Sequence, residues 1–260
     1  MRLEGKIALV TGGGKGLGKA ISLAYAREGA DIIVSSRTQS ALQEAVREIE
    51  AMGRRGLAIV TDLRDPEGIE AMVDRALQKF DKIDILVNNS GVDGPIMKVV
   101  DMDLNAWNEL FTINMTGAML CSKYVLKKSM IPRQSGIIVN IASGTGRLGS
   151  ALRSAYSASK AGLISLNQSL AWEVGRYGIR VNCIAPGAVP SKRVDEVMKE
   201  LSKGMGISIE EITKKTLARS PLGRMVTPDE VSALAVFLAS EESSAMTGQT
   251  VNCTAGAFMN

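Results

Sequence analysis

Short runs of consecutive apolar residues alternate along the chain with longer segments in which apolar residues recur every three or four positions. The short runs predict β-strands at 6–11, 31–36, 56–61, 84–88, 136–141, 179–184 and 249–252. The longer segments predict helices at 16–29, 38–53, 66–80, 104–130, 155–177 and 228–240. Strands that alternate with helices in this way are typical of a parallel sheet with helices on both faces.

The expected fold is therefore an α/β Rossmann fold, a doubly wound parallel sheet of about seven strands. No linker, repeat or low-complexity segment divides residues 1–260, which we interpret as a single nucleotide-binding domain. The segment 188–222 is too long for a simple connection and is expected to contain one or two helices. Inserted segments after a late strand often cover a binding site, so we expect this one to cover the substrate.

Composition narrows the class of protein. The chain is 45% hydrophobic and 22% charged, as soluble globular proteins are, and only 4% aromatic. Its net charge of +4 comes from scattered basic residues, which argues against nucleic acid as a partner. No apolar run approaches membrane-spanning length, and the N-terminus leads into a strand instead of a signal peptide. These features indicate a cytoplasmic protein.

The chain contains no histidine, which excludes histidine-based triads and histidine-ligated metal sites. The three cysteines, Cys121, Cys183 and Cys253, lie far apart and lack metal-ligand spacing. We interpret them as small apolar residues in or near the core, without disulfides, and expect no metal.

A glycine-rich turn, Thr11-Gly12-Gly13-Gly14-Lys15-Gly16-Leu17-Gly18, joins the first predicted strand to the first helix. Glycines let the backbone approach a phosphate, and the helix N-terminus supplies N–H donors. The turn lacks the Gly-Lys-Ser/Thr ending of a triphosphate loop, so it indicates a dinucleotide site instead.

The end of the second strand discriminates between the two nicotinamide cofactors. A carboxylate there would bind the ribose hydroxyls of NAD and repel a 2′-phosphate. This strand instead ends in Ser36 and Arg37, and Lys15 adds a second cation from the glycine turn. Because arginine can pair a phosphate through two hydrogen bonds, NADP is expected and NAD is the less favoured alternative. The competing interpretation is that Arg37 only begins the surface of the next helix.

A tyrosine and a lysine four residues apart, Tyr156 and Lys160, share one face of a predicted helix. An ammonium near a phenol favours the ionised phenol, which can then exchange a proton with a substrate oxygen near neutral pH. Ser143 lies just after the strand at 136–141, at the sheet edge where ligands bind in such folds.

With these features the sequence resembles the short-chain dehydrogenase/reductase family over essentially its whole length, and especially its 3-oxoacyl-thioester reductases. The matching motifs are, in order, Thr11-Gly12-x-x-x-Gly16-x-Gly18, Asp62, Asn88-Asn89-Ser90-Gly91, Asn114, Ser143, Tyr156-x-x-x-Lys160 and Pro186-Gly187. The resemblance implies a homotetramer that transfers a hydride between the cofactor and a carbonyl/secondary alcohol pair.

The resemblance also implies a role for each matching residue. Ser143 would hold the substrate oxygen, Tyr156 would give or take the proton, and Lys160 would favour the ionised tyrosine and bind the nicotinamide ribose. Asn114 would position a water that relays protons from Lys160. Asp62 would accept a hydrogen bond from the adenine amino group.

Further positions are expected to line the cofactor. Asn89 and Gly91 would line the adenosine ribose, and Pro186-Gly187 would form the turn beneath the nicotinamide. The complete expected set is Gly12, Gly14, Lys15, Gly16, Leu17, Gly18, Ser36, Arg37, Asp62, Leu63, Asn89, Ser90, Gly91, Tyr156, Lys160, Pro186, Gly187, Val189 and Ser191.

Three positions depart from the family pattern. Ser90 replaces an alanine, and Pro190 removes a backbone donor before Ser191. The run 252–256, Asn-Cys-Thr-Ala-Gly, replaces an aspartate followed by two glycines. We expect this last change to affect the packing of the C-terminal turn more than the chemistry.

The substrate remains open. In the 3-oxoacyl-thioester reductases, basic residues dock the acidic acyl carrier protein, but Gln134 and Tyr177 occupy those positions here, with Arg133 and Arg176 one residue earlier. Four cations near the expected mouth of the site favour a small anionic substrate, such as a hydroxy acid or a sugar acid: Arg147, Arg153, Lys192 and Arg193. Alternatively these cations serve solubility and pair with Asp195 or Glu196.

Two interpretations other than a carbonyl/alcohol oxidoreductase stay open. A catalytically silent NADP-binding or scaffolding protein could use the same fold, although all four catalytic positions are intact. A dehydratase or epimerase is disfavoured because such relatives usually carry a longer C-terminal substrate domain. The favoured prediction is a cytoplasmic NADP-dependent oxidoreductase acting on a small-molecule or acyl-thioester substrate. The alternative is a dehydrogenase of a small anionic hydroxy acid, a sugar or a polyol.

Overall fold

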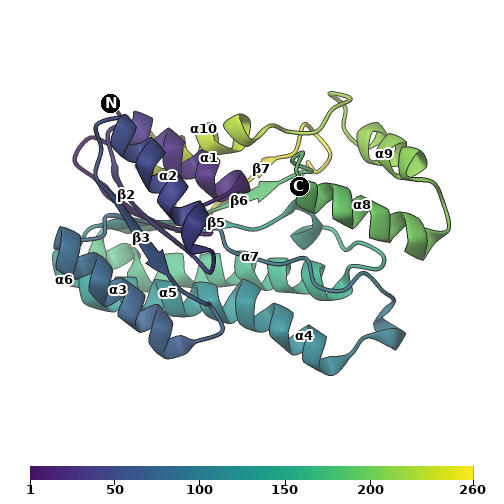
Figure 1. Cartoon of the computed structure of the whole chain (residues 1–260), viewed down its shortest axis with the longest axis horizontal. Coiled ribbons are helices and arrows are strands. Elements are labelled where there is room, and N and C mark those ends of the chain that lie inside the picture. Colours follow the sequence, from purple (N-terminus) through teal and green to yellow (C-terminus); the bar gives the residue numbers. More distant parts are fainter. Residues whose placement is uncertain (260) are drawn as a thin grey trace.

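Seven parallel strands form one sheet in the computed structural model, which describes residues 1–259 (Figure 1). The strands are β1 (Ile7–Thr11), β2 (Asp31–Ser36), β3 (Gly56–Val60), β4 (Ile85–Asn88), β5 (Gly136–Ile141), β6 (Ile179–Pro186) and β7 (Thr250–Cys253). Their order across the sheet is β3-β2-β1-β4-β5-β6-β7. The predicted α/β class and all seven predicted strands are confirmed.

The main helices follow the predicted pattern. They are α1 (Gly16–Arg27), α2 (Gln39–Ala51), α3 (Pro66–Phe80), α4 (Leu104–Phe111), α5 (Gly117–Val125), α6 (Ile131–Arg133), α7 (Ser154–Val174), α8 (Lys192–Met205), α9 (Ile209–Ala218) and α10 (Pro228–Ala239). The single helix predicted at 104–130 is α4 and α5 with two π-helical turns, Thr112–Thr116 and Leu126–Met130. Apolar spacing alone does not reveal a π turn, because it inserts one residue without ending the helix.

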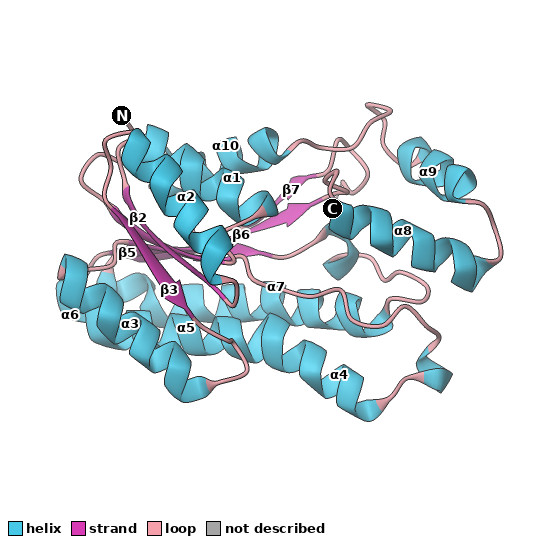
Figure 2. Ribbon diagram, in the orientation of Figure 1, coloured by secondary structure: helices cyan, strands magenta, loops and turns pink. Residues whose placement is uncertain are grey.

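Helices cover both faces of the sheet (Figure 2). The strands are apolar on both sides, so alternate residues of each strand serve two separate cores. In β1, Ala8 and Val10 pack with α1, α2 and α10, whereas Ile7 and Leu9 pack with α3, α5 and α7. Because both faces of the sheet are buried, the strands appear in the sequence as continuous apolar runs.

The direction of the chain across the sheet changes at β1. The chain passes from β1 to β2 and β3 on one side, and then returns to β4 on the other. The loops that follow β1 and β4 therefore diverge and leave a crevice at the carboxyl edge, where open α/β sheets bind ligands. Helices α8 and α9, within the segment 188–222, lie beyond that edge (Figure 1). The segment thus contains two helices, within the expected range.

The unusual C-terminal run forms a closed turn. Ala255 adopts a left-handed backbone, with φ of 51°. Its carbonyl accepts a hydrogen bond of 2.7 Å from the Ser220 hydroxyl. A side chain at Gly187 would come within 3.0 Å of Thr254, so the turn packs directly against the loop after β6.

A buried carboxylate joins the amino ends of the strands. Asp84 accepts a hydrogen bond from the Ile7 N–H at 2.9 Å, and it pairs with Lys82 at 2.9 Å and with Arg133. Burial favours the neutral acid, but these hydrogen bonds outweigh burial and lower the pKa of Asp84. The ionised form therefore stabilises the fold above the unfolded-state pKa of about 3.9.

We expect Asp84→Asn to lower the free energy of unfolding at neutral pH by about 1–3 kcal/mol, because it leaves buried donors poorly paired. The deficit relative to wild type should shrink as the pH falls below about 4, because Asp84 of the unfolded chain is protonated there and folded Asp84 loses its charge at still lower pH. Urea unfolding across a pH series measures both effects. Asp101→Asn, at an exposed position, is the control, and equal stability of the Asp84 variant and wild type would contradict the assignment.

Candidate active site

Tyr156 and Lys160 lie one turn apart near the start of α7, and both side chains are buried, with 8% and 3% exposed. The Lys160 ammonium donates a hydrogen bond of 2.9 Å to the Ile141 carbonyl at the end of β5. It lies 5.9 Å from the centre of the Tyr156 ring. Burial lowers the pKa of Lys160, and attraction to Tyr156 opposes that shift. Lys160 therefore gives up a proton more readily than an exposed lysine does.

Asn114 lies fully buried behind this pair, in the first π-helical turn. Its amide accepts a hydrogen bond from the Val92 N–H at 2.7 Å and donates to the Val92 carbonyl and the Ser159 hydroxyl at 2.9 and 3.1 Å. A side chain at Gly91 would lie 3.1 Å from the Asn114 Oδ1 and 3.4 Å from the Lys160 Nζ. Asn114 thus holds the loop after β4 against α7.

Ser143 follows β5 and is half-buried. Its hydroxyl lies 3.0 Å from the Thr145 hydroxyl and accepts a hydrogen bond of 3.3 Å from the Thr145 N–H. The turn packs tightly, because a side chain at Gly144 would come within 2.3 Å of the Phe258 ring. Phe258 therefore anchors the C-terminal segment beside Ser143.

The glycine turn leaves the backbone open to a ligand. Gly12 and Gly16 have positive φ, and a side chain at Gly18 would stand 2.2 Å from the Gly12 carbonyl oxygen, so only glycine fits. The N-terminus of α1 has no capping side chain at Lys15, unlike α3, α8 and α10. Its first N–H groups are therefore available to an anion.

Thr11 connects the glycine turn to the loop after β4. Its hydroxyl accepts hydrogen bonds from the N–H groups of Asn89 and Ser90, at 3.0 and 3.1 Å, and donates to the Val87 carbonyl. The Asn89 amide donates to the Thr11 carbonyl at 2.9 Å. Replacement of alanine by Ser90 leaves this turn intact.

At the end of β2, Ser36 is half-buried and Arg37 is exposed. Asp62, after β3, is held by Arg64, whose Nη2 lies 2.6 Å from the carboxylate. These hydrogen bonds from Arg64, opposed by burial, lower the pKa of Asp62, and the charge of Arg37 contributes. Asp62 thus lines the cleft as an ionised carboxylate that is already bound to Arg64.

Ser191 caps α8 with its hydroxyl, which accepts from the Val194 N–H at 3.2 Å and donates to the Val189 carbonyl at 3.3 Å. The cap gives the hydroxyl a structural task at the start of the segment that covers the cleft. The contact of Ser191 with the cofactor stays a prediction.

One cleft of about 1580 Å³ brings together most of the predicted residues. Its lining includes Gly12, Lys15, Gly16, Leu17, Gly18, Ser36, Arg37, Asp62, Leu63, Asn89, Ser90, Gly91, Ser143, Tyr156, Lys160, Pro186, Gly187, Val189 and Ser191. Two predicted residues do not line it. Asn114 lies behind Gly91, and Gly14 packs against the backbone of Ala41 and Leu42 in α2. The contact of Gly14 with the cofactor stays a prediction.

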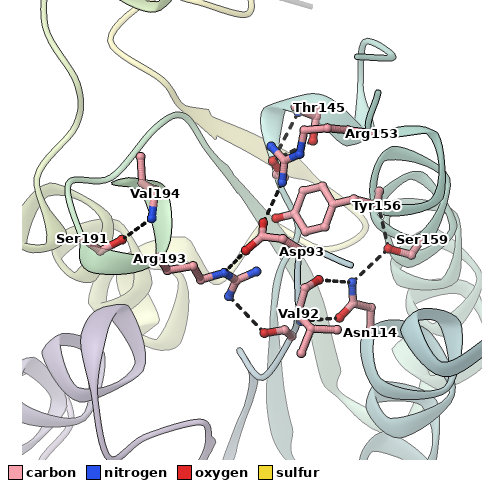
Figure 3. Close-up of polar contacts among 12 residues, drawn as sticks. Val92, Asp93, Asn114, Thr145, Arg153, Tyr156, Ser159, Ser191, Arg193 and Val194 are labelled. Carbon is pink, nitrogen blue, oxygen red and sulfur yellow. Dashed lines mark hydrogen bonds and ion pairs between the residues drawn. The ribbon is translucent and has the colours of Figure 1, made fainter. Parts of the chain in front are cut away.

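The prediction of four cations near the mouth of the site is wrong for one of them. Arg147 points away from the cleft and donates to the Thr250 carbonyl on β7. Arg153 and Arg193 both pair with Asp93, and not with Asp195 or Glu196 (Figure 3). Asp93 was not recognised in the sequence, because nothing in its local pattern indicates two arginines from distant segments.

Comparison with known proteins shows which family has this fold and these motifs. The short chain dehydrogenase family model matches residues 6–202. The 3-oxoacyl-[acyl-carrier-protein] reductase FabG of Thermotoga maritima is 34% identical over 256 residues, which cover 98% of this chain and 99% of that protein.

Two solved structures are close in fold. NAD+-bound xylitol dehydrogenase has a TM-score of 0.95 and 31% identity, covering 98% of this chain and 100% of that one. A variant of actinorhodin polyketide ketoreductase with NADPH has a TM-score of 0.92 and 33% identity, covering 97% of each chain.

We expect Gly18→Ala to destabilise the protein by about 1–3 kcal/mol, since the new methyl group would overlap the Gly12 carbonyl and the Asn89 amide. Gly175→Ala is the matched control, because a side chain there meets no neighbour within 4 Å. Thermal unfolding of both variants measures the difference, and equal midpoints would show that the glycine turn can relax.

Proposed function

This chain belongs to the short-chain dehydrogenase family and is an NAD(P)-dependent oxidoreductase of alcohols and ketones, and we propose that it uses NADP with Tyr156 as its acid and base. The observation that carries the proposal is that Ser143, Tyr156 and Lys160 meet in one cleft with the glycine turn. A catalytically silent relative would have no need to keep this constellation.

The proposed chemistry follows from the side chains. When bound, the nicotinamide ring supplies or accepts the hydride. The Tyr156 hydroxyl gives a proton to the substrate oxygen during reduction and takes it back during oxidation. The Ser143 hydroxyl, held by Thr145, donates a hydrogen bond to the same oxygen. Burial of Tyr156 keeps bulk water from competing for that proton.

Lys160 is proposed to return the proton to Tyr156. Burial lowers the pKa of this ammonium, which favours its release of a proton during turnover. Its hydrogen bond to the Ile141 carbonyl fixes its position beside α7. Because the amide of Asn114 is bound to Val92 and Ser159, we propose that Asn114 positions the loop after β4 around a relaying water.

The residues present fit a dinucleotide. The uncapped α1 N-terminus and the glycine-only contact at Gly18 form a cradle for the pyrophosphate. Asn89 and Gly91 stand along the loop that would follow the adenosine ribose, and Pro186-Gly187 would lie beneath the nicotinamide.

The preference for NADP is supported by the residues that follow β2. Ser36 and Arg37 line the cleft there, where a carboxylate would be needed to favour NAD. Arg37 is exposed, and among residues 1–259 no carboxylate forms an ion pair with it. Its guanidinium is thus available to a 2′-phosphate, and Lys15 lines the same end of the cleft.

Docking of an acyl carrier protein gains little support. Arg133 is bound to Asp84 and to the Ile83 carbonyl at the amino edge of the sheet. Arg176 contacts the Tyr177 hydroxyl at 2.6 Å. We therefore favour a small carbonyl or alcohol substrate over a carrier-bound thioester.

The homotetramer and the cytoplasmic location stay predictions. Among residues 1–259, none of the helices combines the length and apolar character that a membrane crossing requires.

Tyr156→Phe is expected to reduce turnover by about 10²–10⁴-fold, because the proton donor is lost while the ring remains. NADPH affinity should change little, since the rest of the cleft is intact. NADPH oxidation at the nicotinamide absorbance, together with quenching of protein fluorescence by NADPH, separates the two effects. Tyr124→Phe, outside the cleft, is the control, and full activity of the Tyr156 variant would overturn the mechanism.

Arg37→Gln is expected to weaken NADPH binding by about 10–100-fold, the value of a charge-assisted pair to a phosphate, and NADH binding far less. Titration of both cofactors, with the exposed Arg47→Gln as control, measures the ratio. An equal loss for both cofactors would remove the 2′-phosphate assignment.

A further inference from the structure

Three charged side chains from separate segments meet beside Tyr156 (Figure 3). Asp93 lies in the loop after β4, Arg153 precedes α7, and Arg193 lies in the first turn of α8. The Arg153 Nη2 lies 2.6 Å from one Asp93 oxygen, and the Arg193 Nε pairs with the other. The Arg193 Nη1 also donates to the Gly91 carbonyl at 3.0 Å.

The cluster carries an excess of positive charge at a partly buried position. Arg153 and Asp93 have only 13% and 17% of their side chains exposed, whereas Arg193 has 47%. Two guanidinium groups share one carboxylate, so one positive charge is left without a counter-charge within the cluster. Such a charge is costly to bury and attracts an anion. Lys192, which also lines the cleft, carries a further positive charge.

The guanidinium groups also keep donors in reserve. Each arginine has five N–H donors, and Arg153 uses one of them on Asp93. Its Nε is buried and has no hydrogen-bond partner in the part of the chain that the structure describes. An unsatisfied buried donor costs free energy until a ligand binds it.

The backbone holds Arg153 firmly over the catalytic tyrosine. The guanidinium carbon lies 4.1 Å from the centre of the Tyr156 ring. The preceding residue, Leu152, adopts a left-handed backbone, with φ of 65°, and its carbonyl accepts a hydrogen bond from the Met97 N–H at 2.9 Å. Strain of this kind persists where the surroundings demand one placement, and it concentrates at binding sites.

We propose that Arg153 and Arg193 bind a carboxylate of the substrate beside Tyr156, and that Asp93 competes with that carboxylate for the two guanidinium groups. The substrate class is then an oxo acid and its hydroxy acid, not a neutral polyol or a thioester. The proposal rests on the proposed function, since it names the substrate of the same cleft. It gives the three charged residues the task of selecting substrates.

The test compares each oxo acid with its methyl ester, which has the same carbon skeleton and no charge. The ketone stands at C2, C3 or C4 in three such pairs, because the distance between the carboxylate and the reacting carbonyl is unknown. NADPH oxidation measures turnover. Quenching of protein fluorescence by each acid in the enzyme–NADP+ complex, in which the ketone cannot be reduced, measures binding without turnover.

The variants are expected to act in opposite directions. Arg153→Gln and Arg193→Gln should each weaken binding of the preferred acid by about 10-fold or more, the value of a lost charge-assisted hydrogen bond, and should leave the ester nearly unchanged. Asp93→Asn should tighten the acid several-fold, because it frees both guanidinium groups. Lys199→Gln, which removes an exposed charge of α8 outside the cleft lining, is the control and should have little effect.

A purely structural cluster would respond differently. If Asp93→Asn and Arg153→Gln both weaken the acid, or both impair acid and ester equally, the carboxylate site is overturned and the proposed function stands. The proposed function fails instead if the wild-type protein binds the acids, if the arginine variants weaken and Asp93→Asn tightens that binding, and if neither acids nor esters are turned over. A wild-type preference for every ester over its acid would also overturn the carboxylate site.

Discussion

Because all seven strands run parallel, the loops that follow them leave from one edge of the sheet. Residues as distant in sequence as Gly12, Asn89, Ser143 and Pro186 therefore line a single cleft. The reversal of chain direction at β1 opens the crevice at that edge. Each part of the proposed mechanism, from the phosphate cradle to the proton donor, depends on this shared direction.

Close backbone approach at the crevice restricts which residues can stand there. Gly18 touches the Gly12 carbonyl, and Gly91 leaves room for the Asn114 amide and the Lys160 ammonium. Thr11 and Asn114 then hold the loop after β4 with side-chain hydrogen bonds. The site is thus rigid where it would hold the cofactor. Its cover, in contrast, is a separate pair of helices joined to the rest in part by the ion pair of Arg193 with Asp93.

Sequence reasoning succeeded where the signal is local or belongs to a motif. Strand and helix positions follow from apolar spacing, and the glycine turn and the Tyr156–Lys160 pair follow from short motifs of chemical meaning. It failed where the outcome depends on packing between distant segments. Arg147 lies close in sequence to Arg153 but donates a hydrogen bond to the Thr250 carbonyl on β7. A π turn around Asn114 is likewise invisible in the pattern of residues.

The sequence by itself determined the parallel α/β fold, the family and the residues available for proton transfer, because each depends on periodicity or on residues near one another in the chain. Only the tertiary structure decided which charges meet. Asp93, Arg153 and Arg193 come from three separate segments, and their pairing depends on how α8 packs against the carboxyl edge of the sheet. No local pattern encodes that distance, since it results from the packing of the whole chain.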